Sequence, residues 1–178
     1  YGLCWNQLAL RLEPEYDVVL VDARGHGLSS APSEGYTADN LAEDVAVVIR
    51  LLELDQPVLI GHSIGAETAA VVAARYPELV NGVVLEDPPW FGAGLRESEP
   101  ERRAMVDHWR QSIVEMRAKS LEELVEVARE KYPQCDEAEH FHWAKAKQQA
   151  HPEVAQKFME APLDWLELAQ QMRCPALL

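Results

Sequence analysis

The stretch PVLIGHSIGAETAAVVAARYPE, residues 57–78, restricts the possible folds more than any other part of the chain. It opens with the apolar run PVLIG, which is typical of a strand buried on both faces. A helical pattern follows at 65–75, and a single serine, Ser63, stands between Gly61 and Gly65 at the junction. A buried strand that passes directly into a helix is a unit of a parallel α/β sheet.

The same alternation of strands and helices continues on both sides of this stretch. Apolar, β-branched runs at 16–22 (YDVVLVD) and 81–87 (NGVVLED) predict two further buried strands, and the final CPALL predicts the start of a fourth. An amphipathic helix is predicted over 37–54, with Thr37 as its N-cap. We therefore predict an α/β fold whose parallel sheet is flanked by helices.

The charge pattern predicts how this fold is divided. Residues 1–92 carry 14 acidic and 4 basic side chains, whereas residues 93–162 carry 14 and 11 and show only helical patterns. Such a stretch is typical of a separate helical module. We expect a partial α/β core over 1–92, a helical cap over 93–162, and a return to the core with the next strand over 163–178.

Composition limits the possible partners. The formal net charge is −14, so the surface repels phosphate backbones and no nucleic-acid partner is expected. No apolar run approaches the ~20 residues of a membrane span, and no membrane association is predicted. The three cysteines are too few and too widely spaced for a disulfide framework, which favours a reducing, cytoplasmic location. The sequence does not predict an oligomeric state.

Ser63 lies in a G-x-S-x-G pattern with a specific chemical use. A sharp strand-to-helix turn holds the serine in a strained conformation that exposes its hydroxyl, and Gly61 and Gly65 remove bulk on either side. The helix N-terminus favours negative charge, and the amide of Ile64 is placed to donate to a developing oxyanion. His62 is expected to point away from the serine. Ser63 is interpreted as a nucleophile, with a structural turn as the alternative.

Three motifs give the chain a resemblance to the α/β-hydrolase superfamily. VDARGHGLSS (21–30) is similar to the loop after that family's fourth strand, GHSIGAE (61–67) to its nucleophile elbow, and VVLEDPPW (83–90) to its sixth strand and exit, where such enzymes insert a helical cap. The resemblance implies the central part of the fold, with the N- and C-terminal parts missing, so that the chain is expected to be a fragment of a longer protein.

The resemblance also implies a reaction class. A serine at position 63 argues against the haloalkane dehalogenases and epoxide hydrolases of this fold, which use an aspartate nucleophile. It favours a serine hydrolase that acts through an acyl-enzyme on an ester, lactone or similar activated carbonyl of a partly apolar small molecule. A carbon–carbon bond hydrolase and a non-catalytic binding protein of the same fold are the alternatives.

A serine nucleophile needs a histidine base and a carboxylate that orients it. In the family the usual acid and the histidine follow later strands, which places both beyond Leu178, and the isolated segment is not expected to catalyse. Asp87, at the end of the sixth-strand motif, is the alternative acid within the sequence. Trp90 and Phe91 follow it and are expected to line the substrate pocket, with simple packing of the cap as the alternative.

The other histidines are given structural roles. His26 is expected to anchor its loop, which Asp22 and Arg24 brace. His140 and His142 have an i, i+2 spacing that directs them apart on a helix, so they are interpreted as solvated residues of the helical module rather than metal ligands. No metal and no cofactor is predicted.

Overall fold

The computed structural model describes residues 1–90 and 98–178. The chain forms two compact units, each of two segments. The first unit is Tyr1–Glu34 with Arg103–Gln156, and the second unit is Gly35–Arg102 with Lys157–Leu178. Across the described residues, no helix has both the length and the apolar character needed to cross a bilayer.

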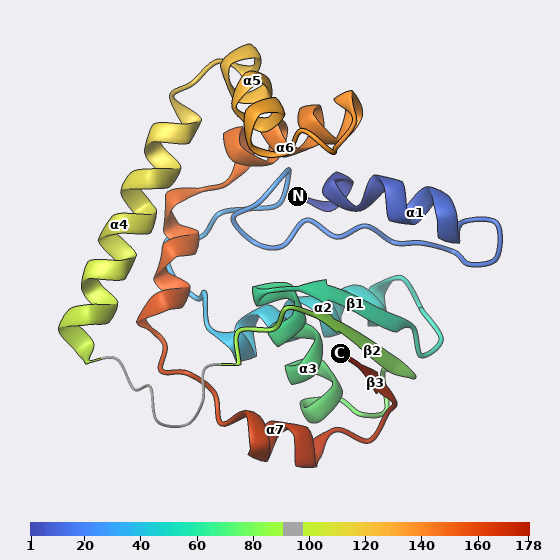
Figure 1. Ribbon diagram of the computed structural model, residues 1–178. Helices are drawn as coiled ribbons and strands as arrows, with labels where there is room; N and C mark the ends of the chain where they lie inside the picture. The colour runs from blue at the N-terminus through green and yellow to red at the C-terminus, as the bar shows by residue number, and fades with distance from the viewer. Residues whose placement is uncertain (91–97) are drawn as a thin grey trace. The chain divides into compact units, whose positions relative to one another are not determined.

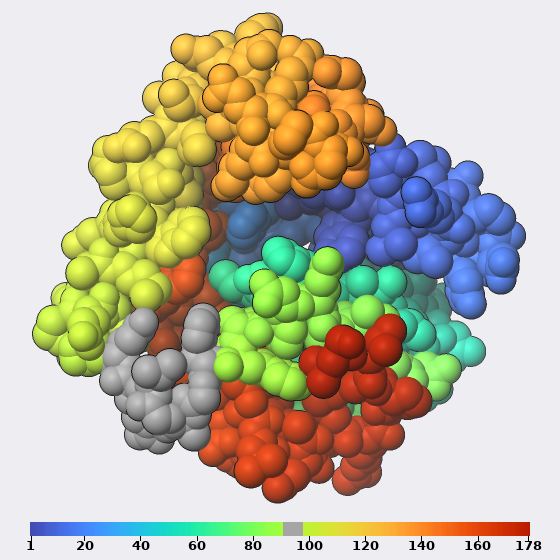
Figure 2. All heavy atoms as spheres, in the orientation of Figure 1, coloured from blue at the N-terminus to red at the C-terminus, as the bar shows by residue number. Residues whose placement is uncertain are grey.

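The second unit contains a three-stranded parallel sheet in the order β1-β2-β3 (Figure 1). The strands are β1 (Val58–His62), β2 (Gly82–Glu86) and β3 (Ala176–Leu177). The predictions of strands at 57–61, at 81–87 and at the end of the chain are confirmed. The final residues, dark red in Figure 2, lie at the surface, and Leu177 is 64% exposed.

Helix α3 (Ile64–Arg75) organises the core of the second unit, because it packs on β1 and β2 and also contacts α2 (Ala38–Leu51) and α7 (Trp165–Gln171). Its small side chains permit close packing on the sheet. The predicted N-cap of α2 is confirmed, since the Thr37 hydroxyl accepts a hydrogen bond from the Asn40 amide at 3.2 Å. The buried apolar side chains of α3 are Ala66, Ala69, Ala70, Val71, Val72 and Ala73.

Residues 16–22, which belong to the first unit, do not form a strand, so that prediction is wrong. Four large apolar side chains of this segment are between 37% and 63% exposed, while Leu20 is half-buried. A β-branched run becomes a strand only where a neighbouring strand accepts its backbone hydrogen bonds, and the fully described first unit offers no such neighbour. The exposed side chains are Tyr16, Val18, Val19 and Val21.

The rest of the first unit is helical. Helices α5 (Leu121–Lys131) and α6 (Glu137–Gln149) pack against each other, and α6 also contacts the 3₁₀ helix η1 (Gly2–Trp5). Both α5 and α6 begin with a capping box, in which the N-cap side chain and the N3 glutamate bond each other's backbone amides. The remaining helices that lie partly or wholly in this unit are α1 (Asn6–Leu12), α4 (Glu99–Arg117) and the 3₁₀ helix η2 (Pro152–Met159).

Candidate active site

Ser63 lies at the sharp turn between β1 and α3, in a conformation that non-glycine residues seldom adopt. Its φ is 52° and its ψ is −119°. Backbone strain of this kind costs about 1–3 kcal/mol and persists where the surrounding structure imposes it. The Ser63 amide donates to the Glu86 carbonyl at 2.9 Å, which ties the turn to the end of β2. Although Ser63 is the N-cap of α3, its hydroxyl makes no capping hydrogen bond, so the side chain is partly exposed and unused by the fold.

Gly61 and Gly65 flank this turn in different environments. A Cβ atom on Gly61 would lie 2.2 Å from the Gly65 carbonyl oxygen and 2.6 Å from the Ala66 nitrogen, so only glycine allows α3 to begin this close to β1. Beside Gly65, in contrast, the described residues place no heavy atom within 4 Å of a Cβ position, apart from its chain neighbours and the backbone of its own helix. The tight turn therefore depends on Gly61, while Gly65 leaves open space next to the serine.

The first turn of α3 offers hydrogen-bond donors near Ser63. The amides of Ala66 and Glu67 donate to the Ser63 carbonyl at 2.9 and 3.1 Å. The Ile64 amide has no acceptor among the described residues, as expected for the first amide of a helix without a side-chain cap. An unpaired amide at a helix N-terminus can donate to an anion that forms beside it.

Asp87 follows β2 as Ser63 follows β1. The two strands pair in parallel with His62 opposite Glu86, so the residues that follow them leave the same edge of the sheet. Asp87 is exposed and has a positive φ of 44°, a second strained backbone at this edge. The fold thus brings Ser63 and Asp87, which are 24 positions apart in the sequence, to the same edge of the sheet.

The neighbouring predicted residues are placed as follows. His62 is exposed at the end of β1. Trp90 is 42% exposed, and its ring lies 5.2 Å from that of Trp165, centroid to centroid. The Trp165 indole donates to the Pro89 carbonyl at 3.1 Å, which fixes the ring pair against the exit of β2. Phe91 lies outside the described residues.

A buried charged cluster one turn into α3 was not found by sequence reasoning. Glu67 is 6% exposed, and its carboxylate accepts a hydrogen bond from the Lys157 ammonium at 2.8 Å. Lys157 donates equally to Glu160 at 2.8 Å. The sequence held a signal, because Glu67 is the only charged residue in the otherwise apolar helix before Arg75. A charged side chain in such a position is buried only with a partner.

In the first unit, Asp22 holds its loop through backbone amides. The carboxylate accepts from the Gly2 amide at 2.6 Å and from the Leu28 amide at 2.9 Å. Burial raises the pKa of Asp22, but these two hydrogen bonds and neighbouring positive charges together outweigh it, and the net pKa is lowered. His26 donates from Nδ1 to the Arg24 carbonyl at 3.1 Å, and burial lowers the pKa of this imidazole. These contacts anchor the loop.

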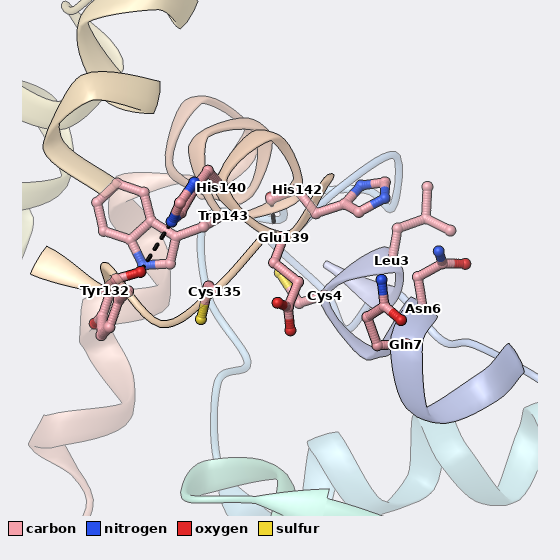
Figure 3. A pocket seen from close by; sticks show the side chains of 10 residues that line it. All are labelled: Leu3, Cys4, Asn6, Gln7, Tyr132, Cys135, Glu139, His140, His142 and Trp143. Carbon is pink, nitrogen blue, oxygen red and sulfur yellow. Dashed lines mark hydrogen bonds between the residues drawn. The ribbon is translucent and has the colours of Figure 1, made fainter. Parts of the chain in front are cut away.

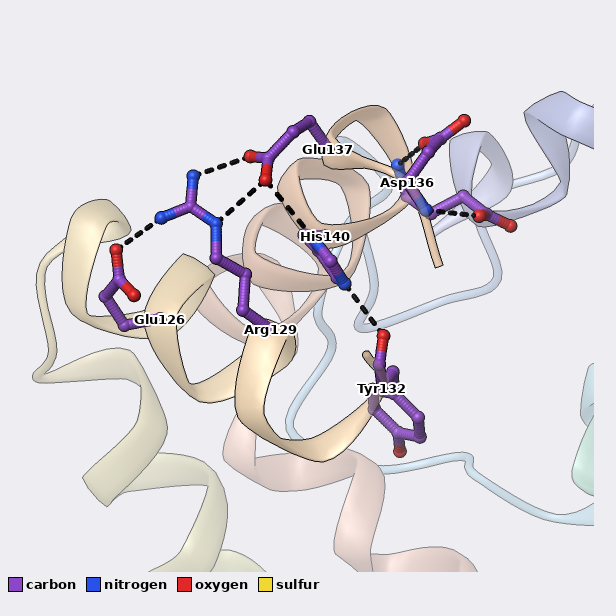
Figure 4. Close-up of polar contacts among 7 residues, drawn as sticks. Glu126, Arg129, Tyr132, Asp136, Glu137 and His140 are labelled. Carbon is purple, nitrogen blue, oxygen red and sulfur yellow. Dashed lines mark hydrogen bonds and ion pairs between the residues drawn. The ribbon is translucent and has the colours of Figure 1, made fainter. Parts of the chain in front are cut away.

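His140 is buried rather than solvated, which corrects the expectation from helical spacing. It is 5% exposed, and its Nε2 lies 2.9 Å from the carbonyl of Tyr132, the C-cap residue of α5 (Figure 4). Its Nδ1 faces Glu137 at 4.0 Å, and Arg129 binds the same carboxylate at 2.6 Å. Glu126 also pairs with Arg129. The histidine therefore joins the two helices of the hairpin.

A cavity of about 210 Å³ lies in the first unit (Figure 3). Its volume is below the ~300–1,000 Å³ of common ligand sites. Burial raises the pKa of Cys4, so this thiol stays protonated at neutral pH. No group of three or more His, Cys, Asp or Glu side chains able to hold a metal is found within residues 1–90 and 98–178. The cavity is lined by Leu3, Cys4, Asn6, Gln7, Tyr132, Cys135, Glu139, His140, His142 and Trp143.

The sequence was compared with models of known protein families, and the result agrees with the parallel sheet and the strand-to-helix turn at Ser63. The model of the alpha/beta hydrolase fold family matches residues 2–161. The chain belongs to the α/β-hydrolase family.

Curated relatives are named as hydrolases. The chain is 45% identical over 83 residues to 2-(acetamidomethylene)succinate hydrolase of Mesorhizobium japonicum, an alignment that covers 47% of this chain and 30% of the relative. It is 37% identical over 116 residues to N-formylmaleamate deformylase of Pseudomonas putida, which covers 65% of this chain and 43% of the relative. The matched regions thus span less than half of these relatives.

Solved structures share the fold over nearly the whole chain. E-2-(acetamidomethylene)succinate hydrolase superposes with a TM-score of 0.75 at 24% identity, over 98% of this chain and 66% of that one. A thermophilic esterase from Thermogutta terrifontis gives a TM-score of 0.73 at 24% identity, over 98% and 65%. At this identity the likeness establishes the fold alone.

Proposed function

We propose that the whole protein is a serine hydrolase in which Ser63 is the nucleophile. The observation that carries the proposal is the strained backbone of Ser63 at the exit of β1, with a hydroxyl that no helix cap uses. Such strain is retained where it serves a site, and the turn places the hydroxyl at the N-terminus of α3, where negative charge is favoured. A structural turn alone would not need a serine in this conformation.

The reaction proceeds in two steps. The Ser63 oxygen bonds to the carbonyl carbon of the substrate while a base removes the hydroxyl proton, and the oxyanion accepts a hydrogen bond from the Ile64 amide. The carbon–leaving group bond then breaks, the leaving group takes the proton, and an acyl-enzyme remains. Water releases the acid by the same route. The base is a histidine that we place beyond Leu178, by analogy with the family.

We assign the orienting acid to Asp87, with an aspartate beyond Leu178 as the alternative. Asp87 leaves the same sheet edge as Ser63, on the neighbouring strand, and its backbone is likewise strained. An acid there can orient a histidine that approaches Ser63 from above the edge.

The relatives indicate the substrate class. Two of them are named for compounds in which an acyl group is bound to nitrogen and which also carry carboxylate groups. Another relative is named a putative esterase/lipase. We therefore extend the proposed substrates from esters and lactones to small N-acyl compounds. Residues 93–162 would form the helical cap, and Trp90 would line the substrate pocket.

The test is covalent labelling of the full-length protein by a fluorophosphonate probe. The wild type should be labelled, and Ser63→Ala should abolish both labelling and hydrolysis, since loss of such a nucleophile typically lowers the rate about 10⁴-fold or more. Ser30→Ala is the matched control, because only the backbone carbonyl of Ser30 is used, by the Gly25 amide, and it should label normally. Labelling that survives Ser63→Ala removes this residue from the mechanism.

The same assay examines the acid. Asp87→Asn should lower kcat about 10³–10⁴-fold, whereas Glu86→Gln, an exposed carboxylate one position earlier, should change it little. Equal activity of Asp87→Asn and wild type places the acid elsewhere. A wild type that is neither labelled nor active on ester, lactone and N-acyl substrates favours the non-catalytic binding protein, and activity confined to carbon–carbon bonds favours that class of hydrolase.

A further inference from the structure

Lys157 occupies an enclosed position in the second unit between two carboxylates. Its side chain is 11% exposed, and those of Glu67 and Glu160 are 8% and 23% exposed. The ammonium lies 2.8 Å from an oxygen of each carboxylate. A long flexible side chain that is so enclosed has lost most of its rotamer freedom, so the cluster has one defined geometry.

The cluster is also anchored to a second helix. The Glu160 carboxylate oxygen that binds Lys157 also accepts a hydrogen bond from the Ala38 amide at 2.8 Å. Ala38 is the first residue of α2, where free amides and the helix dipole favour a carboxylate. Lys157 is therefore tied through Glu160 to the start of α2, independently of its contact with Glu67.

The electrostatics favour a charged lysine more than a charged Glu67. Burial lowers the pKa of Lys157, but Glu67 and Glu160 outweigh it, and the net pKa lies above the usual value. For Glu67, burial raises the pKa and Lys157 offsets only part of the rise. Both pKa values are thus raised, which favours the charged form of Lys157 and disfavours the charged form of Glu67, because one cation serves two carboxylates. Glu67 thus depends on Lys157 to remain ionised in its buried position.

Glu67 links this cluster directly to the proposed nucleophile. Its backbone amide donates to the Ser63 carbonyl at 3.1 Å, while its carboxylate binds Lys157 at 2.8 Å. A shift of the Glu67 side chain therefore acts on the turn of α3 that holds Ser63 and the Ile64 amide. Catalytic geometry is sensitive to such shifts, since a displacement of about 1 Å can lower a rate about 10²-fold.

We propose that Lys157 is a positioning residue for Ser63. By binding both Glu67 and Glu160, Lys157 fixes the first turns of α3 relative to the start of α2. This inference rests on the proposed function, because it concerns the reactivity of Ser63. The buried cluster of Glu67, Lys157 and Glu160 would then affect the reactivity of Ser63, and this effect can be measured separately from any effect on protein stability.

The experiment measures how fast a fluorophosphonate inactivates full-length wild type and Lys157→Met, at a temperature well below the melting point of both. Varying the probe concentration separates the limiting inactivation rate constant from the probe's binding constant. Lys157→Met should lower the limiting rate constant about 10- to 100-fold and leave the binding constant within about threefold. A purely structural role would lower the melting temperature and leave the limiting rate constant within about twofold of wild type, which would overturn the inference.

Two further variants separate positioning from stability. Arg75 lies on α3, like Glu67, and Arg75→Met removes its ion pair with Asp39 of α2, at side chains that are 54% and 70% exposed. This variant should leave the limiting rate constant unchanged. The double variant Glu67→Gln with Lys157→Met leaves no unpaired charge at position 67, so it should melt closer to wild type than Lys157→Met does. Its limiting rate constant should nevertheless stay low, because the bridge is absent. Recovery of the wild-type rate constant in the double variant would overturn the inference.

The outcomes distinguish this inference from the proposed function. Failure of the probe to label the wild type contradicts both. Normal labelling of the wild type, its loss in Ser63→Ala, and an unchanged rate constant in Lys157→Met contradict only the role of Lys157.

Discussion

Two apolar runs of the chain, 57–61 and 16–22, look alike in the sequence and differ in the structure. The first forms β1, whose residues pair one by one with β2 from Val58 opposite Gly82 to His62 opposite Glu86. The second has no strand beside it in its own unit and remains irregular, with exposed valines. An apolar β-branched run makes extended chain favourable, but only a neighbouring strand converts that preference into a sheet.

The exits of the two segments are also held differently. The chain that leaves β1 is held by a backbone hydrogen bond, because the Ser63 amide donates to the Glu86 carbonyl and so continues the hydrogen-bond ladder between β1 and β2. The chain that leaves 16–22 is held by a side chain instead, since the Asp22 carboxylate accepts hydrogen bonds from the amides of Gly2 and Leu28. The first arrangement is independent of pH, whereas the second depends on one ionised group. The comparison yields three predictions, from the largest expected effect to the smallest.

The largest effect is expected at the exit of β1, from Gly61→Ala. The added Cβ would meet the Gly65 carbonyl oxygen at 2.2 Å, and neither backbone can yield without separating α3 from β1. We expect a loss of about 3 kcal/mol or more in the free energy of unfolding, measured by urea titration.

Gly65→Ala is the matched control for Gly61→Ala. It adds the same methyl group at a helical position where the described residues place no atom within 4 Å, apart from chain neighbours and the backbone of the helix itself. It should change the stability by less than about 1 kcal/mol in either direction. Equal losses in the two variants would show that the close approach at Gly61 is not what holds the turn.

A smaller difference in stability is expected between two valine variants, one in β2, the strand that pairs with β1, and one in the irregular segment 16–22. Val83 in β2 is 2% exposed, and Val83→Ala should lower the free energy of unfolding by about 2 kcal/mol. Val19 is 45% exposed, and Val19→Ala should change it by no more than about 0.5 kcal/mol. A loss above about 1.5 kcal/mol for Val19→Ala, again by urea titration, would show that 16–22 is buried in solution.

The smallest effect is expected from Asp22→Asn and depends on pH. Since the folded protein lowers the pKa of Asp22, the ionised carboxylate contributes stability that is present above its ordinary pKa of 3.8 and lost as the pH falls through the lower, folded value. Asp22→Asn should therefore lower the free energy of unfolding by about 1 kcal/mol at pH 7, with the difference shrinking below pH 3.8.

Asp17→Asn serves as the control for this prediction, because Asp17 is an exposed carboxylate in the same segment. Asp17→Asn should leave the free energy of unfolding at pH 7 within about 0.5 kcal/mol of wild type in urea titration. A difference between Asp22→Asn and wild type that persists unchanged at pH 3 would contradict the role given to the carboxylate.

Local signals predicted much of this molecule. The N-cap at Thr37, the strand that precedes Ser63, and the helix that follows it each depend on residues within a few positions of one another, so sequence reasoning found them. The role of Asp22 was predicted only in part, because its partners are amides of Gly2 and Leu28, and one of them is 20 positions away. The burial of His140 was missed because the spacing of residues along α6 does not show that α5 packs over this side chain.

By itself the sequence determined the α/β alternation, the G-x-S-x-G turn and the family, because periodicity, capping and glycine placement are short-range properties of the chain. The tertiary structure alone decided which apolar run became a strand, that Asp87 leaves the sheet edge beside Ser63, and that Glu67, Lys157 and Glu160 meet. These depend on contacts between residues far apart in the sequence. Such contacts form only when hydrogen-bond partners and low-dielectric surroundings are brought together by packing.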